Sequence, residues 1–87
     1  MIVEKKCWPE GFELIRKGEK KYELRLNDFK IGPGDTLILK EFNPKTKEYT
    51  GRKIEKKVLK VDVHDRVFQM YSEKELKEKG IQYIELK

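Results

Sequence analysis

The chain has 87 residues, enough for one small domain and too few for a second. Charged residues make up 43% of the chain and apolar residues 37%, including nine aromatic rings, which is the composition of a folded protein rather than a disordered tail. The 21 Lys and Arg residues exceed the 16 Asp and Glu residues and give a net charge of +5. This mild excess permits a polyanionic partner without requiring one.

Cysteine content and hydropathy limit the location of the protein. Cys7 is the single cysteine, so an intrachain disulfide is excluded and the chain fits a reducing compartment. The first ten residues carry charges where a signal peptide needs an apolar run, and no stretch of about 18 apolar residues occurs. We therefore expect a cytoplasmic protein with no membrane segment.

The first elements expected are a short strand at residues 2–6 and a helix from Pro9 to Gly18. Proline at the first helical position loses no hydrogen bond, and glycine adopts the left-handed conformation that ends many helices. Trp8 and Phe12 fall on one face of this helix. We expect Trp8 to anchor the helix to the core rather than to serve as a platform for a base.

Residues 20–26 alternate between apolar and charged side chains, which predicts a half-buried strand. We expect the apolar face of this strand to lie on the core. The apolar set is Tyr22, Leu24 and Leu26. The charged set on the opposite face is Lys21, Glu23 and Arg25.

Two longer strands follow. Residues 36–42 contain an unbroken Leu-Ile-Leu run, so we expect both faces of this strand to be covered. A hairpin loop at 43–51 precedes a strand at 52–63. Near Val58 the apolar residues of this strand switch from even-numbered to odd-numbered positions, so they would point to opposite faces of a regular strand. A one-residue bulge there would keep both apolar sets inside and bend the strand.

The end of the chain completes an α+β fold. A capping-box pattern at Ser72 predicts a second short helix that stops at Gly80, and residues 81–86 predict a last strand. The order of elements indicates a small mixed β-barrel of about five to six strands with two short helices.

The charged strand carries a motif with fixed spacing, G-x-K-x-x-E-x-R, formed by Gly18, Lys20, Glu23 and Arg25. This motif resembles the signature of the ASCH domains, relatives of the PUA-like RNA-binding barrels. The stretch KCWPEGFELIRKGEKKYELRLND is similar to a small ASCH-related family of unknown function, and the resemblance extends over residues 3–63. It implies that residues 1–87 form a single ASCH/PUA-like domain with a cleft beside the first helix.

The motif side chains are suited to an anionic ligand. Arg25 offers a planar fork of donors for a phosphate or a base edge, Glu23 can hold that fork, and Lys20 can reach a phosphate as a point charge. We therefore expect an RNA- or nucleotide-binding module. Further candidate ligand contacts are Lys6, Trp8, Asn27, Tyr49 and Arg52. The alternative is that the charged face is a solvated surface with weak ion pairs.

Two other functions remain open. Some ASCH relatives are amidohydrolases that act on acetylated cytidine, and a ribonuclease could use the same cleft, with Lys20 and Glu23 as catalytic residues. Glu23, however, stands where the resemblance would place a threonine, which removes the expected nucleophile. The side chains that could replace the missing groups are Thr36, Thr50, Glu73 and Glu75. The third possibility is a protein-interaction module that uses the basic hairpin. This hairpin carries Tyr49 among six cations, which are Lys45, Lys47, Arg52, Lys53, Lys56 and Lys57.

No cofactor or metal is expected. His64 lies between Asp62 and Asp65, but one histidine and two carboxylates at this spacing do not match a zinc site, and no cysteine pair completes one.

Overall fold

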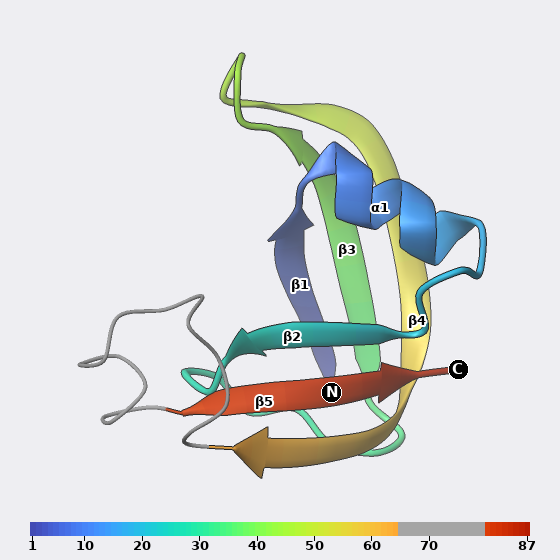
Figure 1. Cartoon of the computed structure of the whole chain (residues 1–87), viewed down its shortest axis with the longest axis vertical. Coiled ribbons are helices and arrows are strands. Elements are labelled where there is room, and N and C mark those ends of the chain that lie inside the picture. Colours follow the sequence, from blue (N-terminus) through green and yellow to red (C-terminus); the bar gives the residue numbers. More distant parts are fainter. Residues whose placement is uncertain (65–79) are drawn as a thin grey trace.

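The computed structural model describes residues 1–64 and 80–87 (Figure 1). Within these residues the chain forms five strands and one helix. The elements are β1 (Ile2–Cys7), α1 (Pro9–Arg16), β2 (Tyr22–Leu26), β3 (Thr36–Asn43), β4 (Glu48–His64) and β5 (Ile81–Leu86). The helix expected from Ser72 lies outside the described residues.

The five strands form one mixed sheet in the order β1-β3-β4-β5-β2. β1 runs parallel to β3, and the other neighbouring pairs are antiparallel. The long strand β4 pairs with β3 through its first part and with β5 through its last part. Because β4 bends between these parts, β2 and β5 cross β1 and β3 at a steep angle (Figure 1).

The sheet does not close into the expected barrel. β1 and β2 are its two edges, and no backbone ladder joins them in the part of the chain that the structure describes. A side chain makes the connection instead, because the Arg25 guanidinium of β2 donates a hydrogen bond to the Lys6 carbonyl of β1. In a closed barrel the β1 edge would pair with a neighbouring strand. Here the Arg25 side chain bonds to this edge instead.

The predicted bulge in β4 is confirmed. The pairing of β4 with β5 shifts between Val58 and Lys60, so Leu59 is the extra residue. The bulge does not bring both apolar sets inside, since Leu59 is 49% exposed and Val63 is also exposed. A second irregularity, between Lys40 and Phe42 of β3, was not predicted.

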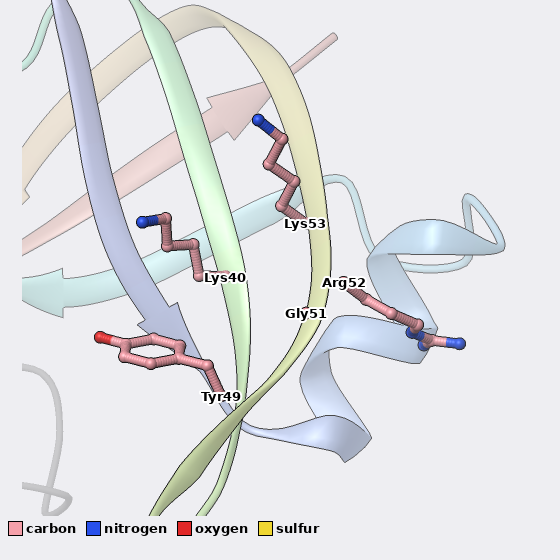
Figure 2. A pocket seen from close by; sticks show the side chains of 5 residues that line it. All are labelled: Lys40, Tyr49, Gly51, Arg52 and Lys53. Carbon is pink, nitrogen blue, oxygen red and sulfur yellow. The ribbon is translucent and has the colours of Figure 1, made fainter.

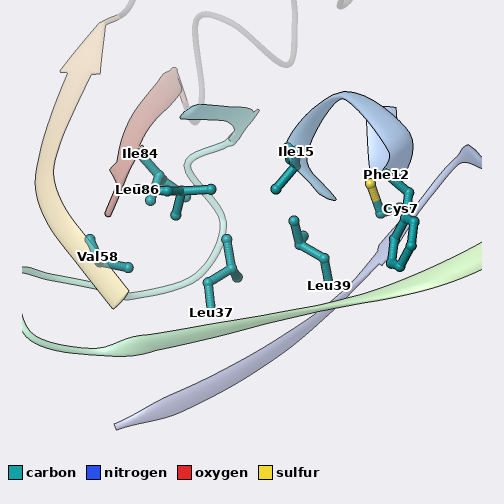
Figure 3. Packing of buried hydrophobic residues seen from close by; sticks show 8 residues of the cluster. All are labelled: Cys7, Phe12, Ile15, Leu37, Leu39, Val58, Ile84 and Leu86. Carbon is teal, nitrogen blue, oxygen red and sulfur yellow. The ribbon is translucent and has the colours of Figure 1, made fainter. Parts of the chain in front are cut away.

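The core lies between the two crossing parts of the sheet and α1 (Figure 3). As predicted, β3 is covered on both faces, because its Leu-Ile-Leu run at 37–39 is buried. The helix contributes Phe12 and Ile15. The expected anchor role of Trp8 is wrong: its side chain is 61% exposed, because this residue precedes the first helical turn in an extended conformation.

The expected orientation of β2 is also wrong. Glu23 is buried at 4% exposure, whereas Tyr22 is exposed and stacks on Tyr83 of β5, with 5.2 Å between ring centroids. Glu23 is paired with Ile84, a core residue, and directly opposite residues of antiparallel strands share a face. The charged face of β2 therefore points toward the core.

Replacement of Leu37, which is fully buried, by alanine should lower the free energy of unfolding by about 2–5 kcal/mol because it leaves a cavity. The matched control is Leu59→Ala at the half-exposed bulge, for which we expect a loss of about 0.5 kcal/mol. Urea unfolding followed by circular dichroism measures both. Equal losses for the two variants would contradict this description of the core.

Candidate ligand-binding site

The motif side chains form a compact charged cluster around Glu23. Arg25 Nε donates to Glu23 Oε2 at 2.8 Å, and Lys20 Nζ lies 3.4 Å from Glu23 Oε1. A buried carboxylate is costly unless it is paired and hydrogen-bonded, and here each oxygen has a cationic partner. The three predicted site residues are therefore brought together, with the carboxylate at the centre.

Arg25 is fixed by two hydrogen bonds in different directions. Nε binds Glu23 and Nη2 binds the Lys6 carbonyl, so the plane of the guanidinium is held at the edge of β1. Its other N–H groups, including both on Nη1, make no hydrogen bond to the described residues. A pre-oriented fork with free donors can bind a phosphate or a carbonyl oxygen.

The edge of β1 presents backbone groups beside Arg25. The Met1 carbonyl accepts from Thr36 of β3 at 3.0 Å, whereas the Lys6 carbonyl accepts from Arg25. Because successive residues of a strand point their N–H and C=O groups to opposite sides, the odd-numbered residues of β1 bond to β3. Glu4 and Lys6 therefore present their peptide groups to the open edge.

A pocket of about 420 Å³ lies at this edge. Its lining contains four cationic side chains, one carboxylate and one aromatic ring. These residues are Lys5, Lys6, Arg25, Lys40, Glu4 and Tyr49. The carboxylate of Glu4 lies 3.4 Å from Lys40 Nζ, which offsets its charge. The pocket is strongly positive and suited to an anion.

Tyr49 provides an aromatic surface in the pocket. Its ring is 53% exposed and is held edge-to-face against Phe42, at 5.2 Å between centroids. Lys6 and Lys40 place their ammonium groups 6.0 and 5.8 Å from its centroid. Such a ring can stack on a base while neighbouring lysines contact phosphates.

A second pocket of about 300 Å³ adjoins the first through Lys40 and Tyr49. Figure 2 shows Lys40, Tyr49 and Lys53 on one side of the sheet, while Arg52 extends to the other side, toward α1. Arg52 therefore contributes to the wall of this pocket near its backbone, with its charged group directed away.

Arg52 joins β4 to the helix. Its guanidinium binds Glu13 of α1 and lies 3.1 Å from Glu41, and it packs over the Phe12 ring at 4.7 Å. Glu13 also accepts two hydrogen bonds from Arg16. Hydrogen bonds from Arg16 and Arg52 lower the pKa of Glu13 from 4.5 to about 2. Arg52 has a clear structural role in these contacts.

The remaining predicted contacts lie at different places. Trp8 is exposed at the start of α1, and Asn27 lines a separate pocket near Met1 and Gln82. The pocket at the β1 edge thus unites Lys6, Arg25 and Tyr49. Glu23 lies outside its lining and holds Arg25, and Lys20 pairs with Glu23. Sequence reasoning missed Glu4, Lys5 and Lys40. Lys6 and Lys40 are register partners across β1 and β3, a contact that no local pattern reveals.

The hydroxyl groups considered for hydrolysis are not found beside the motif. Thr50 donates to the buried Glu41 at 2.6 Å, and Thr36 lies at the start of β3. Glu73 and Glu75 lie outside the described residues. Hydrolysis of acetylated cytidine or RNA therefore stays a prediction without a specific geometric observation in its favour.

Cys7 lies buried beside the charged cluster and α1. The Gly11 position is so close that an added Cβ would lie 3.7 Å from Cys7 Sγ and 4.0 Å from Lys20 Nζ. Burial, and secondly the charge of Glu23, raise the pKa of the Cys7 thiol from 9.0 to about 11. Cys7 is therefore a protonated core residue near neutral pH.

Among residues 1–64 and 80–87, no helix is long and apolar enough to cross a membrane. Nor do three or more of their His, Cys, Asp or Glu side chains gather in a group that could hold a metal ion.

The fold and site define a small β-rich domain with an open mixed sheet and a basic pocket at its β1 edge. A family model described as a domain of unknown function, DUF3850, matches residues 2–74, so the chain belongs to this family. The chain is similar to the crystal structure of hypothetical protein PH0355, with a TM-score of 0.77 and 27% identity over 100% of this chain and 98% of that chain. No curated protein matches.

The raised pKa predicts that Cys7 resists alkylation. At pH 8, a shift from 9.0 to about 11 reduces the thiolate fraction by about 100-fold, and the thiolate is the reactive form. Iodoacetamide labelling followed by mass spectrometry should therefore be at least 100-fold slower in buffer than in urea. Similar rates in the two solvents would show that Cys7 is accessible and ionises normally.

The Glu13 contacts predict a defined acid sensitivity. Because the pKa is lowered in the folded state, the stabilisation by Glu13 is present above about pH 4.5 and is lost as the pH falls toward 2. We expect the wild type to melt at a higher temperature than Glu13→Gln at pH 6, with the difference vanishing near pH 2. Since Glu13 is partly exposed, salt should reduce this difference. A difference independent of pH would contradict the assignment.

Proposed function

We propose that this protein binds RNA or a nucleotide in the pocket at the β1 edge, with Arg25 as the principal contact to the anion. The observation that carries the proposal is the orientation of Arg25. Its guanidinium is held by the buried Glu23 and by the Lys6 carbonyl, and it lines a pocket that contains three lysines and a half-exposed tyrosine.

Each part of this pocket suits one part of a nucleotide. The guanidinium and the lysines match phosphate oxygens, and the Tyr49 ring matches the face of a base. The free peptide groups of Glu4 can bond to the edge of that base. Glu23 acts as a positioning residue, since it holds Arg25, and Lys20 pairs with the other oxygen of Glu23. Neither residue lines this pocket.

We further propose that the domain is of the ASCH type and related to the PUA-like folds. The G-x-K-x-x-E-x-R motif supports this assignment, because its charged residues form one cluster beside the first helix, where the resemblance implies the ligand cleft. A cytoplasmic location, where RNA and nucleotides are abundant, belongs to the same proposal.

Titration of a fluorescent single-stranded RNA at several salt concentrations tests the proposal. The affinity should fall steeply with salt, because each neutralised phosphate contributes about 0.7 to the slope of log K against log salt concentration. Arg25→Ala should weaken binding by about tenfold or more and reduce this slope by about 0.7.

The matched control is Arg16→Ala, which removes an equal charge from an arginine on α1 that pairs with Glu13. We expect its RNA affinity to stay close to that of the wild type, and circular dichroism should show that both variants fold. A salt-independent affinity, or equal losses for the two variants, would refute a phosphate site at Arg25.

A further inference from the structure

Arg25 and Lys5 line two pockets. Besides the pocket that contains Tyr49, they line a smaller one of about 170 Å³, whose other residues are Leu26, Asp28 and Phe29. Lys5 points to the inner side of β1, opposite to Glu4 and Lys6, and its Nζ lies 3.9 Å from the Phe29 ring centroid. The two cations therefore stand between two compartments, each with an aromatic ring.

The region between the two compartments is cationic, whereas each compartment also contains a carboxylate. Lys5 and Arg25, at the centre, favour a phosphate. The larger compartment has a carboxylate, but Glu4 is paired with Lys40. Asp28, in the smaller compartment, is exposed and has no ion pair with the described residues, so it disfavours a phosphate there and can accept a hydrogen bond from an amine.

We infer that the ligand is a two-nucleotide step of a single strand, an inference that rests on the proposed function. The linking phosphate lies between Lys5 and Arg25, one base stacks on Tyr49, and the next base enters the smaller compartment. There its exocyclic amine donates to Asp28, which favours cytosine, adenine or guanine over uracil.

The contact of Lys5 with Phe29 couples the two compartments. An ammonium group interacts more strongly with a phosphate than with an aromatic face, so a bound phosphate draws Lys5 Nζ away from the ring. The ring is then uncovered for the second base. A linked pair of nucleotides should consequently bind better than one nucleotide of greater charge.

Calorimetry with the dinucleotide CpC and with cytidine 5′-monophosphate tests this inference. CpC carries the smaller charge, yet we expect it to bind about tenfold more tightly, because a second base adds stacking. We also expect UpU to bind more weakly than CpC. If RNA binds in a salt-dependent manner but CpC is no tighter than the monophosphate, the inference fails and the proposed function stands. If none of these ligands binds, both fail.

Asp28→Asn separates base recognition from charge. Loss of the carboxylate should strengthen binding of the monophosphate, because a repulsive charge is removed. It should weaken binding of CpC by about fivefold, because the amide oxygen of asparagine accepts a weaker hydrogen bond from the amine than the charged carboxylate does. Asp62→Asn, which removes an equal charge from β4, is the control and should not weaken CpC. Changes in the same direction for both ligands with Asp28→Asn would overturn the role of Asp28.

Discussion

The carboxylate of Glu23 is the feature on which the organisation of this domain depends. A charge buried among core residues must be paired, and the two available partners are Lys20 before β2 and Arg25 within it. Their pairing turns the charged face of β2 inward and brings the Arg25 guanidinium to the edge of β1. The same contacts that offset the cost of burial thus orient the group that we propose as the ligand contact.

Much of the fold could be predicted from the sequence because its signals are local. Short stretches of neighbouring residues indicate four features: the start of α1 at Pro9, the positive φ of Gly18, the buried run in β3 and the bulge beside Val58. The open sheet could not be predicted, because closure depends on whether β1 and β2 meet. The prediction for the orientation of β2 is wrong because an alternating pattern shows that a strand has two different faces without identifying the inner one.

The site residues likewise divide into those that a local sequence pattern indicates and those that it does not. The motif residues could be found because they occupy one short segment, and Tyr49 stood out as an aromatic ring among lysines. Lys40 could not, since it reaches the pocket through the parallel pairing of β1 with β3, which places it beside Lys6, more than thirty positions away. Arg52 was expected to contact a ligand, whereas its guanidinium binds Glu13 and Glu41 across the sheet.

The hydrogen bond from Arg25 to the Lys6 carbonyl has a consequence for solubility. Open strand edges invite pairing with strands of other molecules, and proteins protect them with charges and by covering their backbone groups. At the β1 edge an arginine covers a carbonyl while lysines surround it. A substitution of Arg25 that alters ligand preference would also uncover the Lys6 carbonyl at this edge. Substitution of Arg25 is therefore constrained by the need to prevent edge-to-edge pairing between copies of the chain.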